Sequence, residues 1–312
     1  MAEPTQRDIW VYLPKQYFTS NAPLPVVYYL PGYGDTYMLD VEIPQDFDSS
    51  LQTLKPMIIV VVSGVNLYWG SFFADSPVIG NWGDFVAKDV VDYVDSNYRT
   101  IPHRSSRGLS GHSMGGFGAL NLAMRRAEVF GSVFALAPGL VNSTGIADTQ
   151  MFDSDTHIRE MVAATERLAA MQPAAALAEM ASSHFVFDFA YGMAFAPLLN
   201  PPYYEYPYTL NNNVLVRNDS VMAKWESGFG NVHNEIQEFS QNLSSLSGIG
   251  IDCGTEDYFK WIVRGCSHFD AELTAAGIPH TYTTHGAGHQ DQIRARILTV
   301  MLPFFAQHLA TE

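Results

Sequence analysis

Short strand-like runs that alternate with longer amphipathic segments are the feature that most constrains how this chain folds. Val26–Leu30 (VVYYL) and Ile58–Val62 (IIVVV) are continuous apolar runs, the pattern of strands that are buried on both faces of a sheet. Between Trp82 and Tyr98, apolar residues recur at helical spacing with Asp and Lys between them. Such alternation is typical of parallel strands joined by helical crossovers, so it predicts an α/β fold with a mostly parallel central sheet flanked by helices.

The same alternation continues through most of the chain. An edge strand is expected at Ile9–Leu13, where apolar and polar residues alternate. The further predicted strands are Arg107–Ser110, Val133–Ala137, Gly248–Cys253 and His280–Thr284, and the further predicted helices cover residues 114–127, 231–246, 260–276 and 290–308.

The pattern changes between residues 140 and 229. An Ala/Met/Glu-rich helical stretch at 159–180 is followed by PLLNPPYYEYPY (197–208), a Pro/Tyr cluster that suits neither a helix nor a central strand. We therefore predict a single α/β domain over residues 1–312 that carries 140–229 as an insertion, interpreted as a lid or cap.

The charge balance excludes some classes of partner. Because 17 Lys and Arg stand against 32 Asp and Glu, the formal charge is −15, and the chain lacks the basic surface that nucleic acid or an anionic membrane requires.

The longest apolar stretch of the chain, Met57–Val62, is far shorter than the roughly 20 residues of a membrane span. Met1–Asp8 lacks the apolar core of a secretory signal, so a cytoplasmic location is expected, although removal of a signal peptide would leave the same sequence. The oligomeric state is left open.

The sequence Gly111-His112-Ser113-Met114-Gly115 is a G-x-S-x-G motif between a predicted strand and a predicted helix. The pentad alone is weak, but this position is the one where a serine is held at a sharp strand-to-helix turn with its hydroxyl at the carboxyl edge of the sheet. Small flanking residues suit the strained backbone of such a turn, and the helix N-terminus favours developing negative charge. Ser113 is therefore the predicted nucleophile.

A serine nucleophile needs a base that is oriented by an acid, and in this architecture the acid precedes the histidine in sequence. Asp257, which follows the strand ending at Cys253, is the predicted acid. Glu256 is adjacent but would point the other way in an extended turn, and Asp252 lies within the strand, so both are weaker candidates.

His289, at the end of a glycine-containing segment before the last helix, is the predicted base. His285 lies closer to the strand and is the weaker candidate. The spacing of these two histidines would suit zinc ligands on a helix, but the glycines between them oppose a helix and no third ligand is evident. The two cysteines, at 253 and 266, also lack the spacing of a zinc site. No metal and no cofactor are predicted.

Two backbone N–H groups are expected to stabilise an oxyanion. One belongs to Met114, the residue after the nucleophile, and the other to Tyr33 in the loop LPGYGD (30–35) after an early strand. Gly34, whose backbone can approach a substrate closely, and Trp69, just after the third predicted strand, are candidate substrate-binding residues. Packing explains Trp69 equally well.

The insertion is rich in aromatic residues that are candidates for lining an acyl pocket. Aromatic residues at this density more often form a core. The nine residues are Phe185, Phe187, Phe189, Tyr191, Phe195, Tyr203, Tyr204, Tyr206 and Tyr208.

Beyond these motifs, the chain resembles the esterase D-like branch of the α/β-hydrolases, which includes feruloyl esterases, S-formylglutathione hydrolases and mycolyltransferases. The matching blocks are YYLPGYGD (28–35), GSFFADSPVIGNWGDFVAKDVVDYVDSNYRTIP (70–102), SGHSMGGFGAL (110–120), GTEDYF (254–259) and GAGHQD (286–291). The resemblance implies an α/β-hydrolase fold, a triad of Ser113, Asp257 and His289, and oxyanion donors at Tyr33 and Met114. The chain departs from many relatives, which carry HG at positions 31–32, and from S-formylglutathione hydrolases, which usually have His at position 117.

Together these features predict a serine carboxylesterase that acts on esters of small or aromatic acyl groups through an acyl-enzyme. An acyltransferase, which passes the acyl group to an alcohol, and a thioester hydrolase are alternatives on the same fold. A non-catalytic binding module on a hydrolase scaffold is the alternative from a different class. In each enzymatic case the partner is a small molecule.

Overall fold

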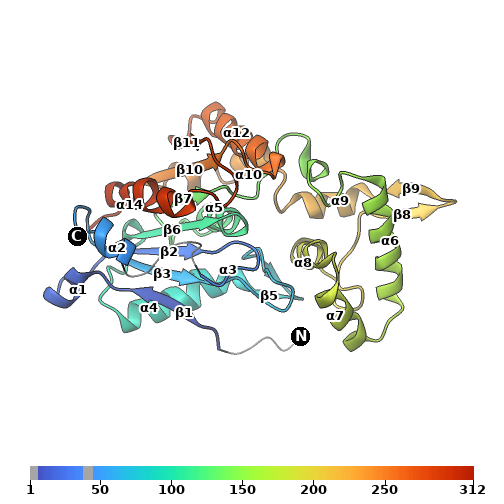
Figure 1. Cartoon of the computed structure of the whole chain (residues 1–312), viewed down its shortest axis with the longest axis horizontal. Helices are drawn as coiled ribbons and strands as arrows, with labels where there is room; N and C mark the ends of the chain where they lie inside the picture. The colour runs from blue at the N-terminus through green and yellow to red at the C-terminus, as the bar shows by residue number, and fades with distance from the viewer. Residues whose placement is uncertain (1–5, 38–44) are drawn as a thin grey trace.

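A seven-stranded sheet forms the centre of the protein in a computed structural model that describes residues 6–37 and 45–312 (Figure 1). Its strands, in spatial order, are β1 (Ile9–Tyr12), β3 (Ile58–Val62), β2 (Val26–Leu30), β6 (Arg107–His112), β7 (Ser132–Leu136), β10 (Gly248–Gly254) and β11 (Thr281–His285). Only β1 is antiparallel to its neighbour, so the mostly parallel sheet predicted from the sequence is confirmed. The first five residues of the N-terminal stretch used for the localisation prediction lie outside the described part.

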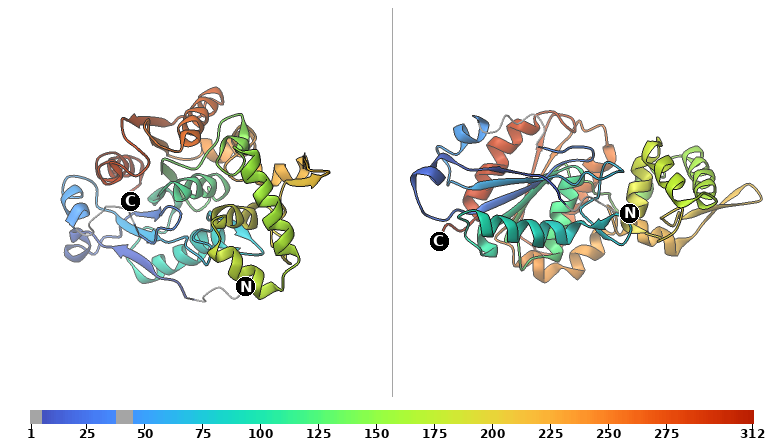
Figure 2. Two further views of the ribbon diagram at one scale, coloured as in Figure 1. Left: turned by 45° about the vertical axis from the view of Figure 1, so that its right-hand side comes forward. Right: turned by 90° about the horizontal axis from the view of Figure 1, so that it is seen from below.

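Helices cover both faces of this sheet (Figure 2). Side chains alternate along β2, so Tyr28 packs in the cluster of one face and Tyr29 in the cluster of the other. The first cluster includes α3 (Trp82–Asp84), the π-helical segment Phe85–Val90, α4 (Val91–Asn97), α5 (Met114–Arg125) and α12 (Lys260–Ala275). The second includes α2 (Gln45–Ser50), α13 (Ile293–Arg296), the π-helical segment Ile297–Met301 and α14 (Leu302–His308). Every residue of β2 and β3 is buried, as their continuous apolar runs predict.

Some helix boundaries differ from the sequence-based expectation. The helix expected over 231–246 is divided into α10 (Val232–Glu238) and α11 (Ser240–Ser244), because Phe239 leaves helical geometry between them. The last helix begins at Ile293 instead of Gln290, since Gln292 has a left-handed backbone with φ of 60°. Short elements without a clear sequence pattern are α1 (Lys15–Thr19), β4 (Asp75–Ser76) and β5 (Gly80–Asn81). No helix in the described ranges is long and apolar enough to cross a membrane.

Residues 140–229 contribute no strand to the central sheet and lie beyond the carboxyl ends of its strands (Figure 1). They form α6 (Asp155–Ala169), α7 (Pro173–Ser182), α8 (Val186–Phe195), the hairpin β8 (Tyr208–Asn211) and β9 (Val214–Arg217), and α9 (Asp219–Glu226). The two ends of this segment meet, because the Val141 N–H donates to the Phe229 carbonyl oxygen at 3.0 Å. Its buried residues belong to the same cluster as those of one face of the sheet.

Candidate active site

The parallel sheet brings the predicted site residues to one edge. Ser113 follows β6, Asp257 follows β10 and His289 follows β11. Since these strands all belong to the parallel part of the sheet, their carboxyl ends lie on the same side. Tyr33 follows β2, which pairs with β6. Such a carboxyl edge is where ligands bind in open α/β sheets.

Ser113 occupies a strained turn between β6 and α5. Its φ of 56° and ψ of −116° lie outside the regions that residues with side chains usually adopt. The turn requires glycines beside it: a Cβ atom on Gly115 would lie 1.8 Å from the Leu30 carbonyl oxygen, and one on Gly111 would lie 2.3 Å from the carbonyl oxygen of Gly115. The small residues of the motif therefore permit close backbone approach, and the strain holds the serine side chain at the start of α5.

His289 lies between Ser113 and Asp257. Its Nδ1 is 2.6 Å from Asp257 Oδ2, and its Nε2 is 2.9 Å from Ser113 Oγ. Because an ionised carboxylate only accepts hydrogen bonds, Nδ1 carries the proton and Nε2 accepts from the serine hydroxyl. Asp257 is fully buried, and its Oδ1 accepts from the Phe259 N–H at 2.8 Å. This geometry allows the imidazole to remove the serine proton while the carboxylate stabilises the charged ring.

The weaker candidates for the acid and the base have other partners. Asp252 forms an ion pair with Arg296, and His285 Nε2 lies 3.4 Å from Asp252 Oδ1. Glu256 is exposed. Within the described ranges, the side chains of Asp252, Glu256 and His285 make no hydrogen bond to the His289 ring. The described residues also contain no group of three His, Cys, Asp or Glu side chains placed to hold a metal ion.

His112, the residue before the predicted nucleophile, holds the backbone of His289. Its Nε2–H donates to the His289 carbonyl oxygen at 2.9 Å, and the two rings lie 4.7 Å apart between centroids. Burial, together with the nearby His289, lowers the pKa of His112 to about 3, so its ring is neutral at pH 7. Its Nδ1 is buried and has no hydrogen-bond partner in the part of the chain that the structure describes. The motif alone predicts no role for this residue.

The two predicted oxyanion donors, Tyr33 and Met114, line the same cavity as Ser113. Met114 is the first residue of α5, and Tyr33 lies in the loop after β2. Neither backbone N–H has an acceptor among the described residues. The Tyr33 ring is held by donation of its hydroxyl to the Tyr68 carbonyl oxygen at 2.7 Å. Both amides are therefore available to a ligand atom.

Gly34 and Trp69 contact each other beside this loop. The Gly34 N–H donates to the Trp69 carbonyl oxygen at 2.8 Å, and Gly34 has a left-handed φ of 83°. The Trp69 side chain is exposed, and neither residue is among the described residues that line the cavity. Their contact with a substrate stays a prediction.

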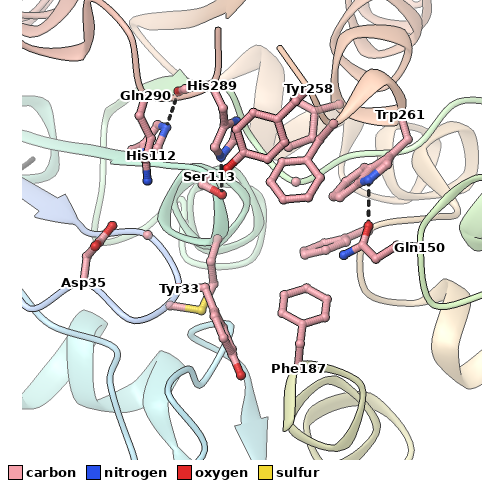
Figure 3. A pocket seen from close by; sticks show the side chains of 16 residues that line it. Tyr33, Asp35, His112, Ser113, Gln150, Phe187, Tyr258, Trp261, His289 and Gln290 are labelled. Carbon is pink, nitrogen blue, oxygen red and sulfur yellow. Dashed lines mark hydrogen bonds between the residues drawn. The ribbon is translucent and has the colours of Figure 1, made fainter. Parts of the chain in front are cut away.

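A cavity of about 300 Å³ opens beside Ser113, and its two ends differ in chemistry (Figure 3). Asp35, His112 and Gln290 lie on one side of the serine (Figure 3). Burial raises the pKa of the Asp35 carboxyl, and the nearby His289 partly opposes that rise. The other side is mostly aromatic and is lined by Gln150, Phe187, Phe229, Tyr258, Phe259, Trp261 and Ile262.

Comparison with known proteins identifies the family of the chain. The family described as "Putative esterase" matches residues 3–292 of the chain. The chain belongs to this esterase family. The resemblance predicted from the sequence blocks is thereby confirmed.

The similar proteins differ in how much of their length the chain covers. It is 34% identical over 131 residues to the esterase Rv1288 of Mycobacterium tuberculosis, a match that includes 39% of this chain and 27% of that protein. It therefore spans about a quarter of the length of that relative. Among solved structures, it is similar to a ferulic acid esterase at a TM-score of 0.62 and 20% identity, over 97% of this chain and 92% of the other. An S-formylglutathione hydrolase from Agrobacterium tumefaciens matches at a TM-score of 0.55 and 16% identity, over 97% and 90% of the two chains. These likenesses confirm the α/β-hydrolase fold.

Most aromatic residues of the insertion form its core. Of the nine residues that the sequence offers, Phe187 is the one that lines the cavity within the described ranges, whereas Phe189, Tyr191 and Tyr204 are at most 1% exposed. Gln150 and Phe229, also from residues 140–229, line the cavity without having been predicted.

The remaining aromatic wall of the cavity comes from Tyr258, Phe259 and Trp261, directly after the predicted acid. Phe259 packs edge-on against His289, with ring centroids 5.1 Å apart, and Tyr258 lies 5.6 Å from the same ring. Their position next to Asp257 is the sequence feature that could have identified them, because residues flanking a catalytic loop share its cleft.

Proposed function

We propose that this esterase is a serine carboxylesterase that forms an acyl-enzyme on Ser113. The observation that carries the proposal is the continuous hydrogen-bonded series from Ser113 Oγ through His289 to Asp257 at the edge of a cavity. In this reaction Ser113 attacks the ester carbonyl while His289 Nε2 takes the serine proton. The imidazolium then donates that proton to the leaving alcohol. A water molecule, deprotonated by the same nitrogen, then attacks the acyl-enzyme; the bond to Ser113 Oγ breaks, the imidazolium returns the proton to that oxygen, and the carboxylic acid leaves.

Stabilisation of the tetrahedral intermediate is assigned to the N–H groups of Met114 and Tyr33. Both amides lack acceptors among the described residues, and the Met114 amide opens α5, a helix of 12 residues. The positive end of the helix dipole and two preorganised donors favour an oxyanion more than they favour a neutral carbonyl. Removal of one such donor typically lowers kcat by about 10²- to 10³-fold.

The acyl group is assigned to the aromatic end of the cavity. A volume of about 300 Å³ accommodates a small acyl group or one that includes an aromatic ring. Phe187 and Trp261 provide flat apolar surfaces for such a ring (Figure 3). In this proposal residues 140–229 act as a cap, because they supply part of that wall. One structural relative is itself named a ferulic acid esterase, which agrees with an aromatic acyl group.

Replacement of Ser113 tests the reaction. We expect Ser113→Ala to lower the kcat for p-nitrophenyl acetate by at least about 10³-fold and to abolish labelling by a fluorophosphonate probe, since no other hydroxyl is placed beside His289 Nε2 in the described ranges. Ser49→Ala, at an exposed position on α2, is the control and should retain both properties. Hydrolysis by Ser113→Ala within tenfold of the parent would contradict the proposal. Product analysis with a competing alcohol would separate hydrolysis from acyl transfer.

A further inference from the structure

Gln150 places an amide in the otherwise aromatic end of the cavity. It lies between the short helical turn Gly145–Asp148 and α6, at the beginning of the segment 140–229. Its Oε1 accepts a hydrogen bond from the Trp261 indole Nε1–H at 2.9 Å. An indole N–H can donate but cannot accept, so only the oxygen end of the amide can face it. The Gln150 Nε2 group therefore points into the cavity (Figure 3).

This NH₂ group has no acceptor in the described part of the chain. The same side of the cavity is lined by Phe187, Phe229 and Ile262, whose side chains carry no polar atoms. Gln150 is half-buried, so water reaches its NH₂ group in the free protein. A ligand that displaces this water without offering an acceptor leaves the donor unpaired against an apolar wall, which costs free energy, whereas a ligand with an acceptor atom avoids that cost.

We propose that Gln150 is a specificity-determining residue that selects acyl groups carrying a hydrogen-bond acceptor. In this proposal the acyl carbonyl lies at Ser113 and the acyl group extends along the aromatic wall towards Gln150, which lines the same cavity, so that its acceptor oxygen accepts from Gln150 Nε2. Figure 3 shows Ser113 and Gln150 at separate positions around this cavity. Trp261 acts as the positioning residue, because it fixes the orientation of the amide. The inference rests on the proposed function, which places an acyl group beside Ser113.

Three substituents of nearly the same shape test this selection. Methyl 3-phenylpropanoates would carry methoxy, ethyl or hydroxymethyl at ring position 3 or 4, so that the acceptor oxygen is present, absent or accompanied by a donor. We expect the parent protein to prefer methoxy over ethyl in kcat/KM by about fivefold at one of the two positions, the effect of one neutral hydrogen bond. Gln150→Leu should bring this ratio to about one. Gln307→Leu, at an exposed position on α14, should keep the parent ratio.

Two further variants distinguish the donor from simple packing. Gln150→Glu keeps the shape and still accepts from Trp261 but presents an oxygen to the cavity, so we expect preference for hydroxymethyl over methoxy. Trp261→Phe frees the amide to present either end, and the methoxy-to-ethyl ratio should fall towards one.

Equal methoxy-to-ethyl ratios in the parent and in Gln150→Leu at both ring positions would overturn the role of Gln150. Hydrolysis of both esters in that experiment would leave the proposed function standing. Absence of hydrolysis for every ester, together with no labelling of Ser113 by a fluorophosphonate, would instead overturn the proposed function and with it the inference.

Discussion

Replacement of His112 by Gln tests whether the buried, neutral imidazole of this residue makes the stability of the protein depend on pH. His112 is 1% exposed, and the one hydrogen bond of its side chain among the described residues is the Nε2–H donation to the His289 carbonyl oxygen. A glutamine amide can make the same donation but does not titrate. The variant therefore removes a titratable group from the cavity edge while keeping the contact with His289.

The expected magnitude follows from the lowered pKa. Burial, together with the nearby His289, shifts the pKa of His112 from 6.5 to about 3 in the folded protein. Between these values the unfolded chain binds a proton that the folded chain does not, so the free energy of unfolding falls as the pH falls. The contribution is complete above pH 6.5 and is progressively lost towards pH 3. At about pH 5 the loss is about 2 kcal/mol, because roughly 1.5 pH units are crossed at 1.36 kcal/mol each.

Urea unfolding of the parent and His112→Gln at pH 8 and pH 5 measures this difference. The free energy of unfolding of the parent should fall by about 2 kcal/mol more than that of the variant between these pH values, since groups that do not interact with His112 contribute equally to both proteins. His184→Gln, at an exposed position, should keep the pH response of the parent. Equal pH responses of parent and His112→Gln, within about 0.5 kcal/mol, would refute the reasoning.

Three further substitutions test other parts of the structure. Asp257→Asn removes the carboxylate that fixes the proton on the imidazole, so kcat for ester hydrolysis should fall by about 10⁴-fold; an unchanged kcat would contradict this role. Gly115→Ala places a Cβ atom 1.8 Å from the Leu30 carbonyl oxygen. Thermal unfolding should show that the variant is less stable than the parent by about 1–3 kcal/mol or more. Arg296→Leu leaves the buried Asp252 without its cation and should cost about 3–5 kcal/mol in urea unfolding. If adding Asp252→Asn did not recover part of that loss, the ion pair would not be its cause.

The parts of the fold that sequence predicts well are those with local signals. The buried runs of β2 and β3 and the turn around Ser113 are recognisable because burial on both faces and close backbone approach restrict the residue types in a short window. The order of Ser113, Asp257 and His289 along the chain also predicts that they meet at one edge of a parallel sheet. The structure places them at hydrogen-bond distances, and their catalytic roles are our proposal.

The wall of the cavity depends on contacts between distant segments. Gln150 and Trp261 are 111 positions apart, and nothing local in either segment indicates that they form a hydrogen bond. Aromatic composition also does not separate core from cavity: Tyr191 and Phe187 lie on the same helix, yet Tyr191 is fully buried and Phe187 lines the cavity. The two residues are four positions apart on one face of α8, with ring centroids 6.5 Å apart, so helical periodicity does not separate them. Tyr191 is covered because its hydroxyl donates to the Trp225 carbonyl oxygen in another helix, and that is a property of tertiary packing.

The hydrogen bond between Val141 and Phe229 has an evolutionary consequence. Because the chain leaves and rejoins the sheet-bearing part at neighbouring positions, the intervening segment is a cassette whose length can change without separating the flanking strands. Ser113, Asp257 and His289 all lie outside the cassette, whereas Gln150 lies inside it. Exchange of the whole cassette would disturb the core that its buried residues share with one face of the sheet, whereas substitutions at its cavity-lining positions would leave the three residues in place. Under our proposed function, acyl preference would then diverge among descendants by single substitutions while the reaction is kept.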